Sequence, residues 1–176
     1  FYPYKFFRIK FFDYICYMRI LYTDIDLVLS LMTEIKPQQS KWGLICRFNS
    51  KAVDVYNFIL KETQAVPVIT SDWKLYYSLK ELQEIFKEWA HIDVAPIDVT
   101  VNYWGECYKT FQEIEECRAM EILEHVNRVK PESWVVIDDL NLSEWIKEDH
   151  FVHLPHPNEG IKQSGRKQEI IRKLLK

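Results

Sequence analysis

Residues 19–30, with the sequence RILYTDIDLVLS, constrain the fold more than any other stretch of the chain. The apolar run at residues 20–22 has the length of a buried strand, and two carboxylates, Asp24 and Asp26, follow one residue apart. Because alternate residues of a strand share a face, we expect both side chains to point toward one site. Adjacent carboxylates repel each other, and a hard divalent cation such as Mg²⁺ would relieve that repulsion. A solvated acidic turn is the alternative interpretation.

Two later apolar runs also end in polar side chains. Residues 134–137 lead into Asp138 and Asp139, and residues 66–69 lead into Thr70 and Ser71. Helical patterns separate the three runs, so the sequence predicts an α/β fold with a mostly parallel sheet. In such sheets the site lies at the carboxyl ends of the strands.

The remaining pattern supplies helices and short strands around these runs. Residues 50–63 and 114–129 each carry one apolar stripe, which is typical of a helix packed on a sheet. A capping box at Ser78 opens a further helix, and Ser164 is expected to cap the last one. Short strands are expected within residues 92–101 and at residues 151–152, whereas residues 31–47 read as a loop.

Composition limits the classes of protein to which the chain can belong. With 176 residues, 48% of them hydrophobic, it can bury the core of one domain. The net charge of -3 does not demand a nucleic-acid partner, and no glycine-rich phosphate cradle is present. The four cysteines form no regular framework, which favours a reduced, cytoplasmic protein. No apolar run approaches a membrane span, so we expect no membrane partner.

Residues 1–17 differ from the rest, because nine of the seventeen are aromatic and charged residues interrupt every apolar run. We expect Met18 to be the natural start, residues 1–17 to be an upstream extension, and residues 18–176 to form a single domain. An added edge strand or a helix packed on the sheet is the alternative for residues 1–17.

The order and spacing of the polar residues resemble the four motifs of the haloacid dehalogenase (HAD) superfamily. The matching elements are Asp24-x-Asp26-x-Val28-Leu29, Thr70-Ser71, Arg118 and Asp138-Asp139. This resemblance implies a three-layer Rossmannoid fold and a Mg²⁺-dependent phosphohydrolase that uses an aspartate nucleophile. Leu27 departs from the pattern, because many relatives carry Gly there.

The resemblance also implies a role for each residue. Asp24 would be the nucleophile, and Asp26 would protonate the leaving group and then activate water. Thr70, or alternatively Ser71, would bind the phosphoryl oxygens, and Arg118 would supply the cation that many members provide as Lys. Mg²⁺ would be held by Asp24, the backbone carbonyl of Asp26, and either Asp138 or Asp139. A solvated helix-surface position is the alternative for Arg118.

Four longer segments resemble the HAD domain of Swiss-army-knife RNA-repair proteins, and the similarity covers residues 19–176. These segments are residues 68–74, 118–122, 134–139 and 159–161. The gaps at residues 31–49 and 102–112 are too short for a large cap, so the site would be open to a bulky substrate, such as a phosphorylated RNA or DNA end or a nucleotide. A small-metabolite or protein phosphatase and a non-catalytic phosphate-binding module are the alternatives. Nearby aromatic side chains would either stack on a base or pack under loops: Trp42, Trp73, Tyr103, Trp104 and Tyr108.

Overall fold

A computed structural model of the chain describes residues 18–34, 36–103 and 110–176. The proposed extension at residues 1–17 lies outside the described residues, as do Trp104 and Tyr108. The expectations for these residues stay predictions.

The centre of the structure is a five-stranded sheet in which every neighbouring pair is parallel. The order is β5 (Asp98–Val99), β4 (Val66–Ile69), β1 (Arg19–Thr23), β6 (Ser133–Asp138) and β7 (Phe151–His153). The chain adds β4 and β5 on one side of β1 and then returns to add β6 and β7 on the other. The strand order therefore reverses at β1, which is the place where open α/β sheets form their sites.

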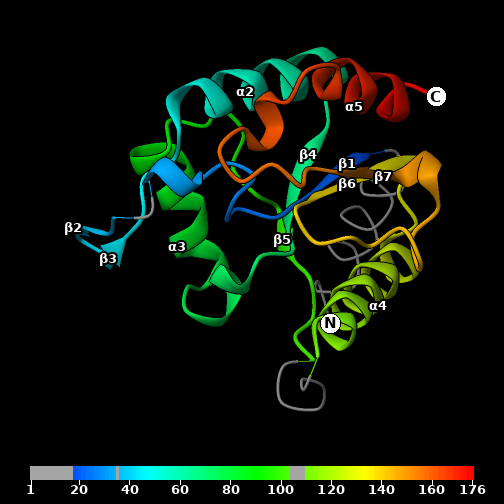
Figure 1. Cartoon of the computed structure of the whole chain (residues 1–176), viewed down its shortest axis with the longest axis horizontal. Helices are drawn as coiled ribbons and strands as arrows, with labels where there is room; N and C mark the ends of the chain where they lie inside the picture. Colours follow the sequence, from blue (N-terminus) through cyan, green and yellow to red (C-terminus); the bar gives the residue numbers. More distant parts are fainter. Residues whose placement is uncertain (1–17, 35, 104–109) are drawn as a thin grey trace, which may run out of the picture.

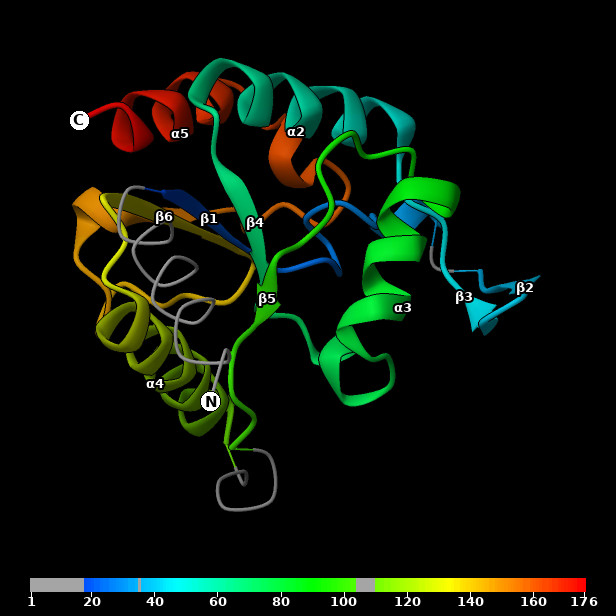
Figure 2. The ribbon, with the colours of Figure 1, turned by 180° about the vertical axis from the view of Figure 1, so that it is seen from behind.

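Helices cover both faces of the sheet, as Figures 1 and 2 show from opposite sides. Helices α2 (Ser50–Thr63) and α5 (Arg166–Leu174) pack together over one face, and α4 (Phe111–Val129) covers the other. Two separate clusters of buried side chains fill the spaces between these layers. The predicted three-layer α/β fold is confirmed. No described helix is long and apolar enough to cross a membrane.

The predicted helix at residues 50–63 is confirmed, and α4 begins three residues before the predicted start. The side chain of Asn49 caps α2 by accepting a hydrogen bond from the backbone of Ala52. At the start of α4, Thr110 and Glu113 form a reciprocal capping box. The T-x-x-E signal for this earlier start is present in the sequence.

The capping box at Ser78 is also confirmed, with Glu81 as its partner. The helix it opens is α3 (Leu79–Glu84), which continues into a π-helical turn, Ile85–Trp89. The prediction that Ser164 caps the last helix is wrong. Gly165 occupies the cap position of α5 without a side-chain bond, and its φ of +80° lies in the left-handed region that favours glycine.

The segment after β1 is more ordered than the expected loop. It contains a 3₁₀ turn (Met32–Glu34) and a small hairpin of β2 (Gln38–Ser40) and β3 (Gly43–Ile45). These strands have three residues each and little alternation of polarity, so no strand signal was visible in the sequence. Among the described residues, this hairpin is the only sheet structure between β1 and α2, and no large cap stands there.

Candidate active site

Backbone register sets three of the predicted site residues level with one another across adjacent strands. Thr23 is paired with Ile69 of β4 and with Ile137 of β6, so the next residues along the strands are Asp24, Thr70 and Asp138. The ladder continues at this level, because the amide of Thr70 donates to the Thr23 carbonyl at 3.0 Å and that of Asp24 donates to the Ile137 carbonyl at 3.1 Å. The neighbouring strands therefore present these side chains at one edge of the sheet.

The face on which Asp24 and Asp138 lie follows from strand alternation. Two residues earlier, Tyr22 and Val136 belong to the hydrophobic cluster beneath α4. Side chains two residues apart share a face, so Asp24 and Asp138 also point toward α4. That helix carries Arg118, which brings the third predicted motif to the same place.

Arg118 is buried among carboxylates. Its Nη1 donates to Asp24 Oδ1 at 2.9 Å and to Asp138 Oδ2 at 3.1 Å, and its Nη2 donates to Asp72 Oδ1 at 3.0 Å. Burial disfavours the charged guanidinium, but the three carboxylates outweigh that effect and raise the Arg118 pKa. The structure therefore differs from the solvated helix-surface alternative, because only 8% of this side chain is exposed.

The carboxylates of this cluster are strongly desolvated. Burial raises the pKa of Asp24 and raises that of Asp138 well above its usual range, although Arg118 partly offsets both shifts. Burial and the charge of Asp24 raise the pKa of Asp139 to about 7. Oxygen atoms of Asp24, Asp138 and Asp139 lie within 4.8 Å of one another. This crowded set of hard oxygen donors fits a divalent cation such as Mg²⁺.

Asp26 lies at the mouth of the site. β1 ends at Thr23, so strand alternation alone does not set the direction of Asp26, although the charges of Asp24 and Arg118 reach it. Its carboxylate accepts a hydrogen bond from the indole N–H of Trp73 at 2.9 Å. The residue reaches solvent, but desolvation by the surrounding protein and the charge of Asp24 raise its pKa to about 6.

Thr70 and Ser71 have different surroundings. Thr70 Oγ1 is buried and has no hydrogen-bond partner among the described residues. Ser71 Oγ accepts a hydrogen bond from the amide of Trp73 at 3.5 Å. A buried hydroxyl without a partner is costly, so Thr70 is the better candidate to bind an oxygen atom of a ligand.

Three residues of the site escaped the sequence analysis: Asp72, Lys74 and Glu121. Asp72 binds Arg118, and Lys74 forms a buried ion pair with Glu121 of α4. Lys74 Nζ also donates to the Thr70 carbonyl at 3.1 Å and to Thr100 Oγ1 at 2.8 Å. The i,i+3 spacing of Arg118 and Glu121 places both on one helix face, which was the available signal.

A buried polar chain extends the same face of α4 away from the site. His125 Nδ1 lies 2.9 Å from the Tyr22 hydroxyl, and its Nε2 lies 3.2 Å from Asp98 Oδ2. Since the carboxylate can only accept, Nε2 carries a proton and donates to Asp98. The chain joins β1, α4 and β5, and it thereby fixes the helix that carries Arg118.

The loop that follows Asp24 is held by a close backbone approach. Leu27, which departs from the motif that the sequence resembles, has a φ of 59° in the left-handed region. Gly160 also has a positive φ, and a Cβ there would lie 2.4 Å from the Val28 carbonyl oxygen. The amide of Ile161 donates to the same carbonyl at 3.1 Å. Only glycine fits at position 160 without displacing this loop.

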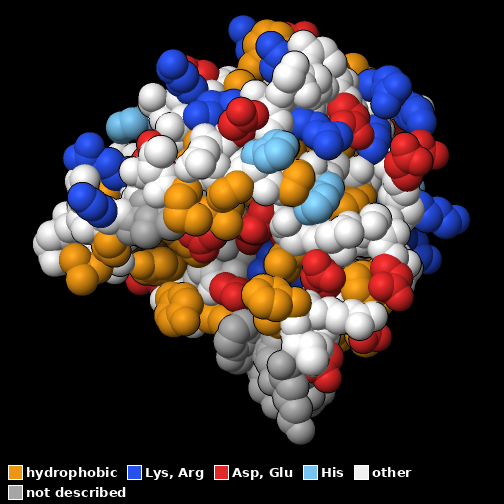
Figure 3. Space-filling model, viewed as in Figure 1, with side chains coloured by type: hydrophobic (Ala, Val, Ile, Leu, Met, Phe, Trp, Pro, Cys, Tyr) orange, Lys and Arg blue, Asp and Glu red, His pale blue; other side chains and the backbone are white. Residues whose placement is uncertain are grey.

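Of the aromatic side chains that were expected either to stack on a base or to pack under loops, Trp73 and Trp42 pack against the hydrophobic core. Trp73 is buried and packs edge to face on Phe48, so it is not a stacking face for a base. Trp42 and Tyr103 are partly exposed. Figure 3, drawn from the same side as Figure 1, shows acidic side chains gathered around a hollow near the middle of this face, with hydrophobic side chains beside them.

The protein combines a doubly wound parallel sheet with an aspartate after the central strand and a second acidic pair on the neighbouring strand. The buried guanidinium of Arg118 lies between these acids. This combination defines a HAD-type domain. Residues 20–165 match the family described as the HAD domain in Swiss Army Knife RNA repair proteins, and the chain belongs to that family. At the level of the family, this supports a phosphohydrolase-type activity. No curated protein and no solved structure matches the chain.

Proposed function

We propose that the protein is a Mg²⁺-dependent phosphohydrolase that forms an acyl-phosphate (aspartyl-phosphate) intermediate on Asp24. The observation that carries this proposal is the convergence of Asp24, Asp138 and Asp139 around Arg118 at the carboxyl end of the central strand. Phosphoryl transfer depends on positioning and charge neutralisation, and this site supplies a nucleophile, a fixed cation and a set of metal ligands. The unpartnered hydroxyl of Thr70 provides a donor for a phosphoryl oxygen.

The reaction takes place in two displacements. An oxygen of Asp24 attacks phosphorus, the bond from phosphorus to the leaving oxygen breaks, and Asp26 gives that oxygen a proton. Asp26 then takes a proton from water, the water oxygen attacks phosphorus, and Asp24 is released as a carboxylate. Arg118 holds Asp24 in position throughout. Asp24, the Asp26 carbonyl and Asp138 or Asp139 would hold Mg²⁺, which would supply positive charge to neutralise the phosphoryl group.

The substrate that we propose is a phosphorylated end of nucleic acid or a nucleotide. The family occurs in RNA repair proteins, and no large cap encloses the site among the described residues. Several large hydrophobic side chains are exposed on segments that follow the carboxyl ends of β1, β4 and β5, where a base would reach them: Met32, Leu44, Tyr76 and Phe111. Exposed aromatic faces favour stacking on unpaired bases.

Replacing Asp26 with Asn tests the role of this residue as general acid. For a nucleoside monophosphate, whose alkoxide leaving group needs a proton, we expect kcat to fall roughly a hundredfold or more. For p-nitrophenyl phosphate, whose leaving group departs unprotonated, the first displacement should be much less affected. Rapid-quench measurement of the first turnover checks this contrast. Equal losses for both substrates would contradict the role.

Mg²⁺ is expected to stabilise the protein through the acidic cluster. A ligand that binds only the folded state adds about 2.7 kcal/mol to the free energy of unfolding at a concentration one hundred times its Kd. Thermal unfolding with and without Mg²⁺ should therefore show a higher Tm with the ion, and Asp139→Asn should reduce that rise. Asp93→Asn, which changes an exposed carboxylate, is the matched control. A Tm rise that is equal in all three proteins would remove the metal site from the proposal.

A further inference from the structure

A second hollow lies along the edge strand β7, and we call it the β7 hollow. Its volume is about 590 Å³, within the range of small-molecule sites. It lies between the loop after β6, the edge strand β7 and helix α5. Its lining includes Asn141, Ser143, Glu148, His153, Arg166 and Glu169.

His153 joins the β7 hollow to the active site. In the parallel register it is paired with Asp138, and its Nε2 lies 2.9 Å from the backbone carbonyl of Asp139. Asn141, which also lines the hollow, follows Asp139 by only two residues. Because strands are spaced about 4.8 Å apart, β7 lies about 10 Å from β1 and Asp24. A single nucleotide can bridge that distance.

The charges of the β7 hollow argue against a second phosphate group. Arg166 and Lys173 both pair with Glu169, at 2.6 and 2.9 Å. Lys173 also donates to the carbonyls of Glu148 and Phe151, so its ammonium group is fully engaged. The side chain of Glu148 adds a further negative charge to the lining. The lining therefore suits an uncharged group that forms hydrogen bonds.

Two side chains of the β7 hollow retain free hydrogen-bonding capacity. A carbonyl can only accept, so His153 Nε2 carries a proton in its bond to Asp139, and the other ring nitrogen, Nδ1, is left for a ligand. Asn141 Oδ1 accepts from the amide and the hydroxyl of Ser143, which orients its amide N–H groups as donors. No described residue bonds to either of these free groups. Both side chains line the same hollow, and hydrogen-bonding groups of this kind can recognise the edge of a nucleobase.

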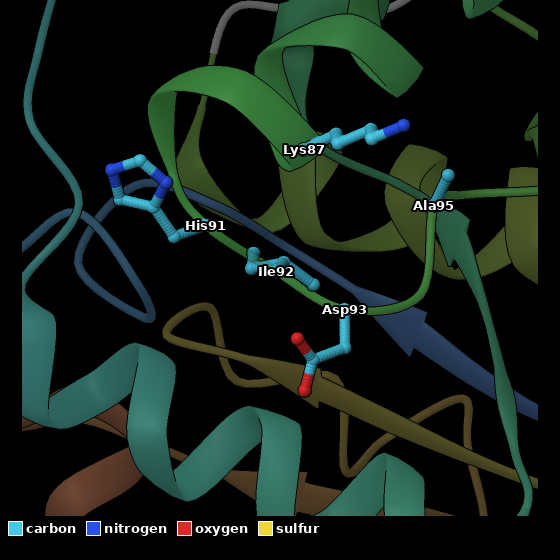
Figure 4. Close-up of a pocket in the computed structure, with 5 residues that line it drawn as sticks. All are labelled: Lys87, His91, Ile92, Asp93 and Ala95. Atoms are coloured by element: carbon cyan, nitrogen blue, oxygen red, sulfur yellow. The ribbon is translucent and has the colours of Figure 1, made fainter.

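We propose that the β7 hollow binds the nucleoside portion of the substrate while its phosphoryl group lies at Asp24, and that Asn141 and His153 determine this preference. The proposal rests on the function proposed above. A different hollow beside α3 does not share these features, as Figure 4 shows. There, the side chains of Lys87, His91 and Asp93 point in different directions and do not converge on one ligand.

Asn141→Asp tests the proposal, because it keeps the oxygen that Ser143 binds and removes the amide donors. We expect kcat/KM for a nucleoside monophosphate to fall roughly threefold to tenfold relative to that for phenyl phosphate, mainly through KM. Gln168→Glu makes the same amide-to-carboxylate change at an exposed position of α5 outside the hollow, and should leave the ratio unchanged. If the ratio of kcat/KM for the nucleoside monophosphate to kcat/KM for phenyl phosphate were the same in Asn141→Asp as in wild type, the proposal would be overturned.

A binding measurement separates this proposal from the proposed function. Uridine, which carries no phosphate, should shift the NMR signals of the His153 ring and the Asn141 amide in wild type but not the His153 signals in Asn141→Asp. If wild type hydrolyses neither ester yet shows these shifts, the proposed function fails and the nucleoside site stands. If it hydrolyses both esters and uridine shifts neither signal, the nucleoside site fails alone.

Discussion

Asp24→Asn is expected to lower kcat for phosphate release by at least about a thousandfold, because the amide cannot form the covalent phosphoryl intermediate. The substitution is close to isosteric. The Asn oxygen can still accept the hydrogen bond that Arg118 now donates at 2.9 Å, so we expect the fold and the position of Arg118 to persist. Phosphate release from an aryl phosphate, a nucleoside monophosphate and end-phosphorylated RNA, each with and without Mg²⁺, measures the effect.

The control for this substitution is Asp54→Asn, which changes an exposed carboxylate on α2. We expect it to retain the activity of wild type. If Asp24→Asn released phosphate at a comparable rate, a covalent role for Asp24 would be excluded. If wild type bound Mg²⁺ but released no phosphate from any substrate, the chain would be a phosphate-binding module and not an enzyme.

Arg118→Met is expected to lower the free energy of unfolding by about 3–5 kcal/mol at pH 7 in the absence of metal. Removing one partner of a buried ion pair leaves the other charge without compensation, and here two buried carboxylates, Asp24 and Asp138, lose the same guanidinium. Urea unfolding in the presence of EDTA measures the change. Arg128→Met removes an exposed Arg from the same helix, and we expect it to cost less than about 1 kcal/mol.

The cost of Arg118→Met should depend on pH in a defined direction. Burial raises the pKa values of Asp24 and Asp138 above their unfolded values, and loss of Arg118 would raise them further. A raised pKa means that the folded state binds the proton more tightly, so protonation stabilises it and the stabilisation is lost as pH rises through the folded pKa. The difference in the free energy of unfolding between Arg118→Met and wild type should therefore shrink as pH falls from 7 to 5. A difference that grows on acidification would contradict the assignment of this cost to the buried carboxylates.

Local patterns predicted most of the elements. The helix at residues 50–63 and the strand at residues 66–69 were predicted with their observed bounds, because their periodicity and their flanking residues agree. The hairpin at Gln38–Ser40 and Gly43–Ile45 was missed, because three-residue strands have too few positions to show alternation. Ser164 resembles a helix cap, but the chain turns through Gly165 at a positive φ instead.

The sequence determined which chemical groups this protein can use, since the apolar runs that end in acids, and the Arg on an amphipathic helix, are local patterns. Only the tertiary structure decided how these groups meet. The parallel register sets Asp24 level with Asp138 and Thr70, and the packing of α4 inserts Arg118 between the carboxylates. The exposure of Asp26, the buried pair of Lys74 and Glu121, and the β7 hollow likewise depend on segments far apart in the chain. Strand order and burial determine these contacts, and no short stretch of sequence encodes either one.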